Sequence, residues 1–441
     1  MLRMSLFNRF LLLSCCALLV AGCTTGPVNS NTASVAPTPS PSALSSPAKT
    51  ETTSVQITLP LLDALLSDGK FVEQLKTKLK LSEQQIDSLK QVSSAEIARL
   101  RETNAEETDG DSGNARERAT EQLRSILGDD KARQLTSLAN DYWSKGGEAG
   151  DTGVQMLPGP NAVPTDTRVV VNIPAFRMDL FQDGRLIKSY KIGIGYPEFP
   201  LPFGLRKAQT IIVNPSWTPP DSPWVANMKN AVPGETIPPG DKDNPLGPIK
   251  IPIGLPSLIH GGKSPARIGK FASHGCVGLT TPQVKDFAML LSKASGTQFT
   301  DQTLASYMQD KDHTKTVKLD QPVPVELRYE TIVLEDGKLY VYKDVYGQDT
   351  NTEENLRRVL EAHGVRFEDL SEQQRTEALN ALNTMSAHPQ PTPSPSPEAS
   401  PAKKGAKKKP AKPQNEIVID LNGLGKKGYP APVNLDEGRV K

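Results

Sequence analysis

The side chains best suited to chemistry lie in the stretch Ser273-His274-Gly275-Cys276-Val277, and a second histidine, His260, precedes Cys276 by sixteen residues. A thiol attacks acyl groups only as the thiolate, and a neighbouring imidazole can accept its proton. If His274 and Cys276 lie in one extended stretch, their side chains point to the same side. His260 ends an apolar run and could reach Cys276 from an adjacent strand. The pattern therefore indicates a cysteine nucleophile that a histidine activates.

Gly275, the residue before the cysteine, adds a second feature of acyl-transfer sites. Without a side chain it permits an unusual backbone dihedral and a close approach of the backbone to a substrate. The backbone N–H groups of Gly275 and Cys276 are natural donors to the oxyanion of an acyl-transfer intermediate. We therefore expect both N–H groups to form an oxyanion hole.

The N-terminus has the features of an export signal. Arg3 and Arg9 supply a positive start, and residues 10–20 form an apolar run that is too short to span a bilayer comfortably. We therefore expect residues 1–22 to be a signal peptide that is removed from the mature protein.

The end of this run, Leu19-Val20-Ala21-Gly22-Cys23, resembles the bacterial lipobox, in which the cysteine is lipidated. The alternative is an ordinary signal peptide with a cysteine there by chance. Lipidation would anchor the protein at Cys23 without a membrane span. The residue after Cys23 is Thr24, and not the Asp that acts as a retention signal at this position. By resemblance to diderm lipoproteins, this favours the outer membrane, facing the periplasm. Cys276 is then the one cysteine left for chemistry, and no intramolecular disulfide can form.

Length and charge limit the classes of function. The 441 residues leave room for two folded units and linkers. The chain has 51 Lys and Arg against 50 Asp and Glu, a formal net charge of +1, which gives no electrostatic case for binding nucleic acid. A lysine-rich run near residues 403–412 reads as a solvated disordered segment, or as a segment attracted to acidic wall polymers or anionic lipid.

Composition and periodicity divide the chain into segments. A capping box begins at Ser82 in a region of helical spacing, whereas the run Val169–Ile173 and the turn Asp183-Gly184 indicate strands and a hairpin. Short strands with few helices favour a mainly β catalytic domain, a sandwich or a barrel. The expected segments are a signal peptide (1–22), a Ser/Thr/Pro-rich tether (23–55), a helical region (56–145), a linker (146–166), the mainly β catalytic domain (167–345), a helical extension (346–388) and a Pro/Lys-rich disordered tail (389–441).

A family resemblance rests on His260-Gly261-Gly262, Ile268-Gly269 and Ser273-His274-Gly275-Cys276-Val277. Together they closely resemble the signature of the YkuD-type L,D-transpeptidases, including the sixteen-residue spacing from histidine to cysteine. Upstream landmarks agree, namely Asn172–Arg177, the Asp183-Gly184 hairpin, Asn214–Pro220 and Asn244–Gly247. The resemblance covers roughly residues 167–330 and includes neither the helical region nor the tail.

The resemblance implies a YkuD-like β-sandwich or barrel in a wall-facing setting. It implies Cys276 as nucleophile and His260 as general base and acid, with the backbone at Gly261 holding the imidazole and with Ser273 and His274 shaping the site. The implied reaction cleaves the bond after the L-centre of the third residue in a peptidoglycan tetrapeptide stem. D-Ala leaves, an acyl-thioester forms, and an amine of another stem or of a protein accepts the acyl group. No metal or other cofactor is implied.

One position departs from the family pattern. The residue two positions after the cysteine is commonly Arg or Asn, and here it is Gly278. Either of the usual side chains could form hydrogen bonds near the site or hold a substrate carboxylate. Arg267 stands where many members have a small residue, so we expect its guanidinium to replace the missing side chain in space.

Four other interpretations are open from the sequence. Cys276 could be a buried small apolar residue, since free cysteine is often buried. Alternatively His260, His274 and Cys276 could be zinc ligands, although only three candidates exist. The same fold could also hydrolyse stems as an L,D-carboxypeptidase or endopeptidase. Finally, Gly278 and the appended helices would suit a wall-binding lipoprotein that has lost catalysis.

Overall fold

A computed structural model describes residues 57–102, 112–144, 155–219, 225, 228, 230–389, 415–424 and 428–438. The chain divides into two units, Met1–Glu51 and Thr52–Lys441, and all described residues belong to the second. The expected signal peptide, the lipidation site Cys23 and the tether lie outside the described residues. Within the described part, no helix combines the length and apolar character that a membrane span requires.

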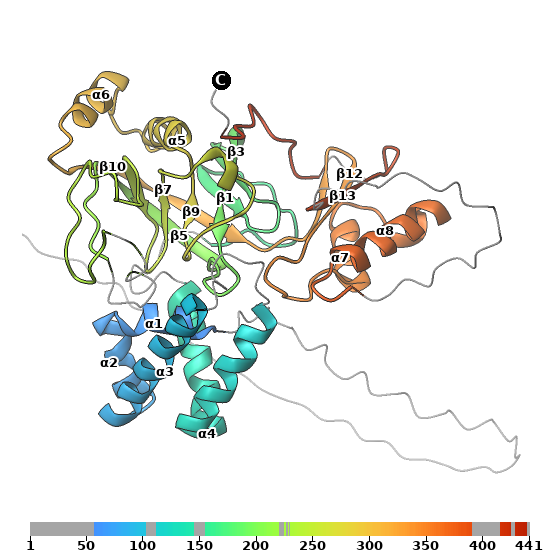
Figure 1. The fold of residues 1–441 in the computed structure, drawn as a ribbon. Helices are drawn as coiled ribbons and strands as arrows, with labels where there is room; N and C mark the ends of the chain where they lie inside the picture. Colours follow the sequence, from blue (N-terminus) through green and yellow to red (C-terminus); the bar gives the residue numbers. More distant parts are fainter. Residues whose placement is uncertain are drawn as a thin grey trace, which may run out of the picture. The chain divides into compact units, whose positions relative to one another are not determined.

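Four helices precede the strands: α1 (Leu59–Leu66), α2 (Gly69–Lys78), α3 (Glu83–Glu102) and α4 (Ser112–Ser144), which bends at Gly128 (Figure 1). The predicted capping box is present, because Gln85 donates its N–H to Ser82 Oγ and accepts from the Ser82 N–H. The apolar faces of the helices form one core, with Phe71 and Leu135 fully buried.

The strands form one large sheet in the order β3-β2-β1-β10-β5-β6-β7-β9. Their bounds are β1 (Arg168–Asn172), β2 (Arg177–Gln182), β3 (Arg185–Lys191), β5 (Gly204–Val213), β6 (Ile249–Pro252), β7 (Leu258–His260), β9 (Val277–Gly278) and β10 (Lys315–Arg328). The predicted hairpin turn joins β2 to β3, and Asp183 and Gly184 both have positive φ, at 51° and 76°. Strands β4 (Ile194–Gly195) and β8 (Phe271–Ser273) form a small parallel pair beside it.

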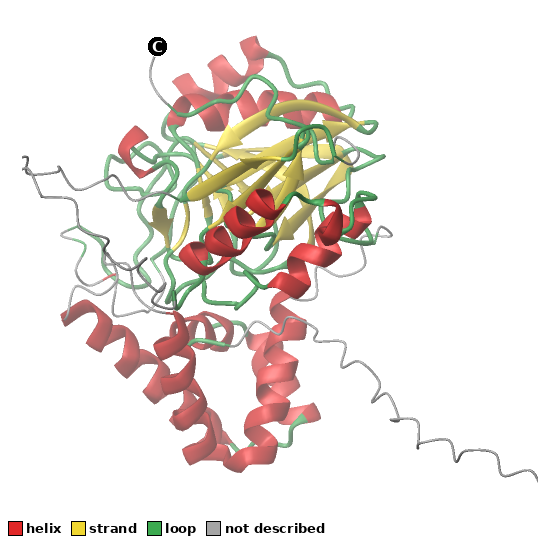
Figure 2. Ribbon diagram, turned by 90° about the vertical axis from the view of Figure 1, so that its right-hand side faces the viewer, coloured by secondary structure: helices red, strands yellow, loops and turns green. Residues whose placement is uncertain are grey.

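The large sheet curls until its two edges meet. Gly193, just beyond β3, donates its N–H to the Gly278 carbonyl at 2.9 Å, and Gly278 of β9 returns the bond at 2.8 Å. The expected sandwich or barrel is therefore a single curled sheet whose edges join at a pair of glycines. Figure 2 shows the strands in yellow, lying next to one another.

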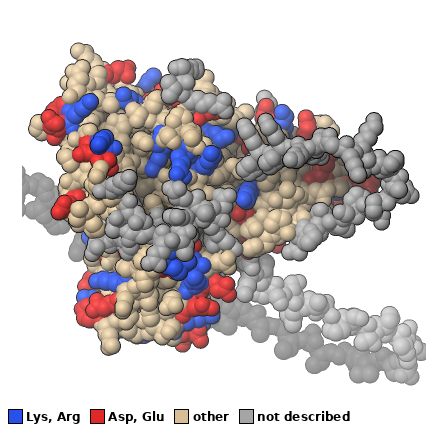
Figure 3. Space-filling model, in the orientation of Figure 1, with Lys and Arg blue, Asp and Glu red and all other residues tan. Residues whose placement is uncertain are grey.

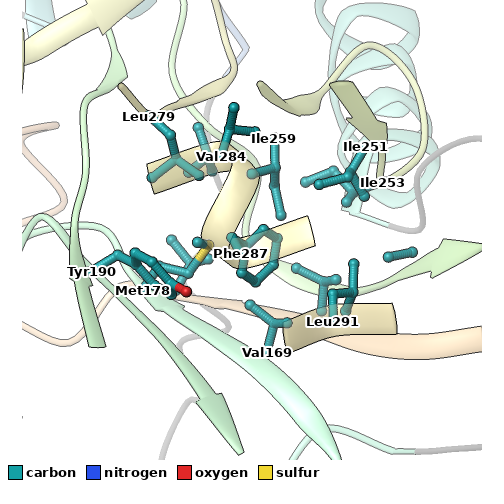
Figure 4. Packing of buried hydrophobic residues seen from close by; sticks show 14 of the residues in the cluster. Val169, Met178, Tyr190, Ile251, Ile253, Ile259, Leu279, Val284, Phe287 and Leu291 are labelled. Atoms are coloured by element: carbon teal, nitrogen blue, oxygen red, sulfur yellow. The ribbon is translucent and has the colours of Figure 1, made fainter. Parts of the chain in front are cut away.

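Helix α5 (Thr281–Ala294) fills the core of the curled sheet, and α6 (Asp301–Gln309) follows it. Its apolar face packs inward, since Val284, Phe287 and Leu291 are fully buried. Figure 4 shows Phe287 among side chains from the strands, with Ile259 of β7 nearby. This packing fixes one face of β7 and β9, so their other face is the one available for a site.

A second sheet of β11 (Ile332–Glu335), β12 (Lys338–Tyr342) and β13 (Glu416–Asp420) packs against α7 (Glu353–Ala362) and α8 (Glu372–Met385). The expected domain boundary at residue 345 falls inside this unit. Strand β13 also corrects the disordered tail expected for 389–441. The sequence Glu-Ile-Val-Ile-Asp of β13 pairs with β12, because β-branched residues suit a strand. This short run was missed because the prediction of disorder rested on the average composition of the whole tail.

The described end of the chain returns to the large sheet. Asp436 donates its N–H to the Ser189 carbonyl at 2.9 Å and accepts from the Lys191 N–H at 2.8 Å, so residues 433–436 cover the edge strand β3. Covering an edge protects its unpaired backbone groups from pairing with another chain.

Figure 3 shows acidic and basic side chains interspersed over the visible face.

Candidate active site

Cys276 lies in a tight turn between β8, which ends at Ser273, and β9, which begins at Val277. Ser273 Oγ accepts a hydrogen bond from the Cys276 N–H at 3.0 Å and donates to the Cys276 carbonyl. The buried Ser273 hydroxyl thus fixes the backbone of the cysteine from both sides. Since the Cys276 N–H is already used, this geometry corrects the expected oxyanion hole with two free backbone donors.

Gly275 makes the turn possible. Its φ is +86°, in the left-handed region that favours glycine. The chain is therefore not extended from His274 to Cys276, so the condition under which both side chains would point to one side is not met. The Gly275 N–H makes no hydrogen bond to another described residue, so it is the backbone donor that remains near the thiol.

Gly195 of β4 supports this turn by close packing. A Cβ at position 195 would lie 2.2 Å from the Phe199 carbonyl oxygen and 3.1 Å from the Gly275 nitrogen. We expect Gly195→Ala to lower the free energy of unfolding by about 1–3 kcal/mol, the usual cost of overpacking. Urea unfolding measures this, with Gly296→Ala as a contrast because no atom lies within 4 Å there, although its φ of +78° adds strain. Equal stability of Gly195→Ala and the wild type would contradict the packing.

The pairing of β7 with β9 brings His260 to the cysteine. The two strands are parallel, with Ile259 opposite Val277 and His260 opposite Gly278. Ile259 and Val277 are fully buried in the core, so His260 faces the other side of the sheet. Cys276 directly precedes β9, two residues before the partner of His260, so the register places the two residues on neighbouring stretches of chain at the same edge of the sheet.

The His260 ring is held in one tautomer. Its Nδ1 lies 2.8 Å from the Gly261 carbonyl oxygen, which can only accept, so Nδ1 carries the proton and Nε2 is the basic nitrogen. Burial lowers the pKa of His260 to about 3, and the positive charge of Lys263 acts in the same direction. His260 is therefore neutral at neutral pH.

Burial of a neutral His260 makes stability depend on pH. The unfolded chain binds a proton near pH 6.5, whereas the folded chain does so only near pH 3. The contribution is complete above pH 6.5 and is lost as pH falls toward 3, by about 2–3 kcal/mol between pH 7 and 4.5. Urea unfolding of the wild type and His260→Gln at both pH values measures it. The variant should lose less stability on acidification, and an identical loss in both proteins would contradict this.

The thiol itself rests in the protonated form. Burial of the sulfur raises the pKa of Cys276, while a hydrogen bond from the Leu258 backbone and the charges of Lys263 and Arg206 oppose the rise. Part of the residue remains exposed. The resting pair is therefore a neutral thiol and a neutral imidazole, and the proton moves only when the substrate carbonyl is attacked.

Arg206 of β5 is a buried cation that sequence reasoning missed. Its guanidinium donates to the carbonyls of Gly254 and Leu255, at 2.9 and 3.1 Å, and to the carbonyl of Trp143 at the end of α4. Burial lowers the pKa of Arg206 to about 9, so it stays charged at neutral pH. Arg206 thus connects two parts of the protein, the loop before β7 and the helical region. Its charge also favours the thiolate of Cys276.

Lys263, not Arg267, lies over Gly278, which corrects the expected replacement. A Cβ on Gly278 would lie 2.9 Å from Lys263 Cγ and 3.2 Å from Cε, so the lysine stem occupies that space. Arg267 lies in a short 3-10 turn, and its guanidinium donates to the Tyr196 hydroxyl at 3.3 Å. A lone lysine has no spacing signature, so the sequence offered no signal for it.

Residues 166–314 match the YkuD family, the L,D-transpeptidase catalytic domain. This segment, which contains His260 and Cys276, is therefore similar to a YkuD catalytic domain.

Curated relatives and solved structures are similar to part of the chain. Probable L,D-transpeptidase ErfK/SrfK of Escherichia coli strain K12 is 27% identical over 163 residues, which is 35% of this chain and 50% of that protein. Probable L,D-transpeptidase YbiS of the same strain is 25% identical over 157 residues, with 35% and 51% covered. The chain thus spans about half the length of these curated relatives. The NMR structure of the catalytic domain of an E. faecium L,D-transpeptidase has 16% identity and a TM-score of 0.25, with 38% of this chain and all of that chain covered.

Aromatic side chains form a wall beside the cysteine turn. The His274 ring contacts Phe199 and Tyr196, with ring centroids 4.6 and 5.3 Å apart. Leu100 of α3 packs on the same two aromatic residues. His274 therefore has a packing role in this wall, and His260 is the histidine whose register suits a base.

The N-terminal helices hold the loop that carries this wall. Arg118 of α4 donates to the Glu198 carboxylate at 2.9 Å, and Thr58 donates to the Glu198 carbonyl at 2.8 Å. Burial raises the pKa of Glu198 to about 7, although Arg118 opposes the rise. The helical region thus contributes to the shape of the site.

The zinc interpretation was considered for His260, His274 and Cys276. Across the described ranges, no group of three or more His, Cys, Asp or Glu side chains is arranged to hold a metal ion.

Proposed function

We propose that this protein is a cysteine L,D-transpeptidase that joins stem peptides of peptidoglycan to an amine acceptor. The observation that carries the proposal is the parallel register of β7 and β9, in which His260 pairs with Gly278, two residues after Cys276. The match of residues 166–314 to the L,D-transpeptidase catalytic domain supports the same reaction class.

In the acylation step, His260 Nε2 accepts the thiol proton while Cys276 Sγ attacks the carbonyl carbon of the third stem residue. The Gly275 N–H donates to the oxyanion that develops on that carbonyl. The tetrahedral intermediate then collapses, the amide C–N bond breaks, and His260 gives its proton to the departing amine of D-Ala. The product is a thioester between Cys276 and the tripeptide stem.

In the second step, an acceptor amine attacks the thioester carbonyl. The amine loses a proton to His260, the C–S bond breaks, and His260 returns the proton to Cys276. The acceptor is an amine on a second stem or on a protein. The neutral resting state of both residues suits this cycle, because neither step begins with a buried ion pair.

We propose further that the protein is exported and anchored by lipid at Cys23, on the outer membrane facing the periplasm. The lipobox-like end of the apolar run supports this location, and so does a substrate that lies outside the cytoplasmic membrane. Radiolabelled palmitate incorporation in the wild type and its loss in Cys23→Ala would test the anchor.

Product analysis with purified tetrapeptide muropeptides tests the reaction. We expect D-Ala release together with a crosslinked dimer, resolved by mass spectrometry. D-Ala release with tripeptide and no dimer would assign hydrolysis instead of transfer. Absence of both products would contradict an enzymatic role and favour a wall-binding lipoprotein.

A further inference from the structure

The side chain of Lys263 crosses the face of the sheet that bears the catalytic pair. Gly278 pairs with His260, so a Cβ on Gly278 would point to the same face as the imidazole. The Lys263 stem runs through that space, with Cγ, Cε and Cδ at 2.9, 3.2 and 3.5 Å from the Cβ position. Its backbone is fixed beside β9, because the Lys263 N–H donates to the Leu279 carbonyl at 3.0 Å.

The ammonium of Lys263 has no carboxylate partner within the described chain. The charged groups that act on it are the Cys276 thiol and the like charge of Arg267, and its charge acts in turn on both catalytic residues. Burial lowers the pKa of Lys263, since the charged form loses solvent. A half-buried cation without an anion is stabilised when a ligand supplies one.

The proposed donor supplies an anion at this place. In a tetrapeptide stem, the terminal carboxylate and the scissile nitrogen are bonded to the same α-carbon of D-Ala. When the scissile carbonyl meets Cys276, that carboxylate must therefore lie close to the sulfur. A pentapeptide has a neutral amide there and leaves the cation unpaired.

We propose that Lys263 binds the terminal carboxylate of the tetrapeptide donor and so selects tetrapeptide over longer or amidated stems. This inference rests on the proposed transpeptidase function. Gly278 is part of the arrangement, because any larger side chain at that position would displace the lysine stem. Arg267 is less suited, since its guanidinium is engaged with the Tyr196 hydroxyl.

The test compares a tetrapeptide muropeptide with its C-terminal carboxamide. We expect wild-type kcat/KM to favour the carboxylate by at least about 10-fold, the size expected for a hydrogen bond between charged groups. Lys263→Met keeps the stem over Gly278 and removes the charge, so it should lose this preference. Lys263→Arg should retain it, and so should Lys270→Met, an exposed lysine near the site. An undiminished preference in Lys263→Met would overturn the proposal.

Binding measurements separate this inference from the proposed reaction. In a Cys276→Ala background, which cannot form a thioester, calorimetry with the same two ligands should show about 10-fold tighter binding of the carboxylate, abolished by Lys263→Met. If the wild type releases no D-Ala but this pattern holds, the reaction fails and the anion site stands. If the wild type releases D-Ala and the two ligands bind equally, the anion site fails alone. Thermal unfolding of each variant verifies that it is folded.

Discussion

Replacing Cys276 with alanine is expected to reduce D-Ala release from tetrapeptide muropeptides by at least about 10³-fold, as for loss of a nucleophile. No other described residue can take over, because Cys276 is the one free cysteine there. The Ser273 hydroxyl bonds to the backbone of residue 276, not to its sulfur, so the turn should persist in the variant. Chromatographic assay of released D-Ala measures the effect.

Two controls make this prediction sharp. Thermal unfolding of Cys276→Ala should stay close to the wild type, since the substitution removes a single atom from a residue of intermediate exposure. A carbapenem should add its mass to the intact wild-type protein and not to Cys276→Ala. Retention of more than a tenth of the wild-type rate by the folded variant would show that another group is the nucleophile.

Replacing His260 with glutamine is expected to reduce the acylation rate by about 10²–10⁴-fold, the usual contribution of a general base. The thiol pKa is raised by burial, so the thiolate cannot form readily without a base beside it. Single-turnover acylation at pH 7 measures the loss. At high pH the variant should recover part of the rate, because hydroxide can then deprotonate the thiol.

A matched histidine provides the control. His313 is exposed, with 70% of its side chain accessible, and pairs with Asp310 away from the thiol. His313→Gln should acylate at the wild-type rate. If His260→Gln also acylates normally while His274→Gln does not, the base would be the histidine of the aromatic wall, and the strand register would not be the decisive feature.

The proposed catalytic pair could be picked out in the sequence because its signals are local. The spacing from His260 to Cys276 and the glycine before the cysteine are visible in the chain itself. The side of the sheet that each residue faces depends on the pairing of β7 with β9. From the sequence we expected only that His260 lies on a strand adjacent to Cys276. An extended chain from His274 to Cys276 was one possibility, and it is not adopted because Gly275 has a positive φ, which glycine readily accepts.

The charges around the thiol could not be predicted from sequence. Arg206 lies on a strand seventy residues before Cys276, and Lys263 reaches the site only because Gly278 leaves room for its stem. Arg267 was expected in that place since it was the unusual cation nearby, but its position in a short turn directs it to Tyr196. Such placements follow from tertiary packing, which neither periodicity nor motif spacing encodes.

The fold, too, could be predicted from the sequence only where the signals are local. Strong turn and strand patterns located the hairpin of β2 and β3. Strand β13 was hidden in a tail of Pro, Ala and Lys, because five β-branched and acidic residues do not change the average composition of such a segment. The sheet edges join at Gly193 and Gly278, which are far apart in the chain. No local sequence pattern therefore predicts this contact.

The most direct test of the account is the intact mass of the protein after rapid acid quench with tetrapeptide muropeptide. We predict a new species whose mass equals protein plus muropeptide minus D-Ala, with the added group on the proteolytic fragment that contains Cys276 and absent from Cys276→Ala. A wild-type protein that releases D-Ala with no such species, or with the group on another residue, would contradict a thioester on Cys276.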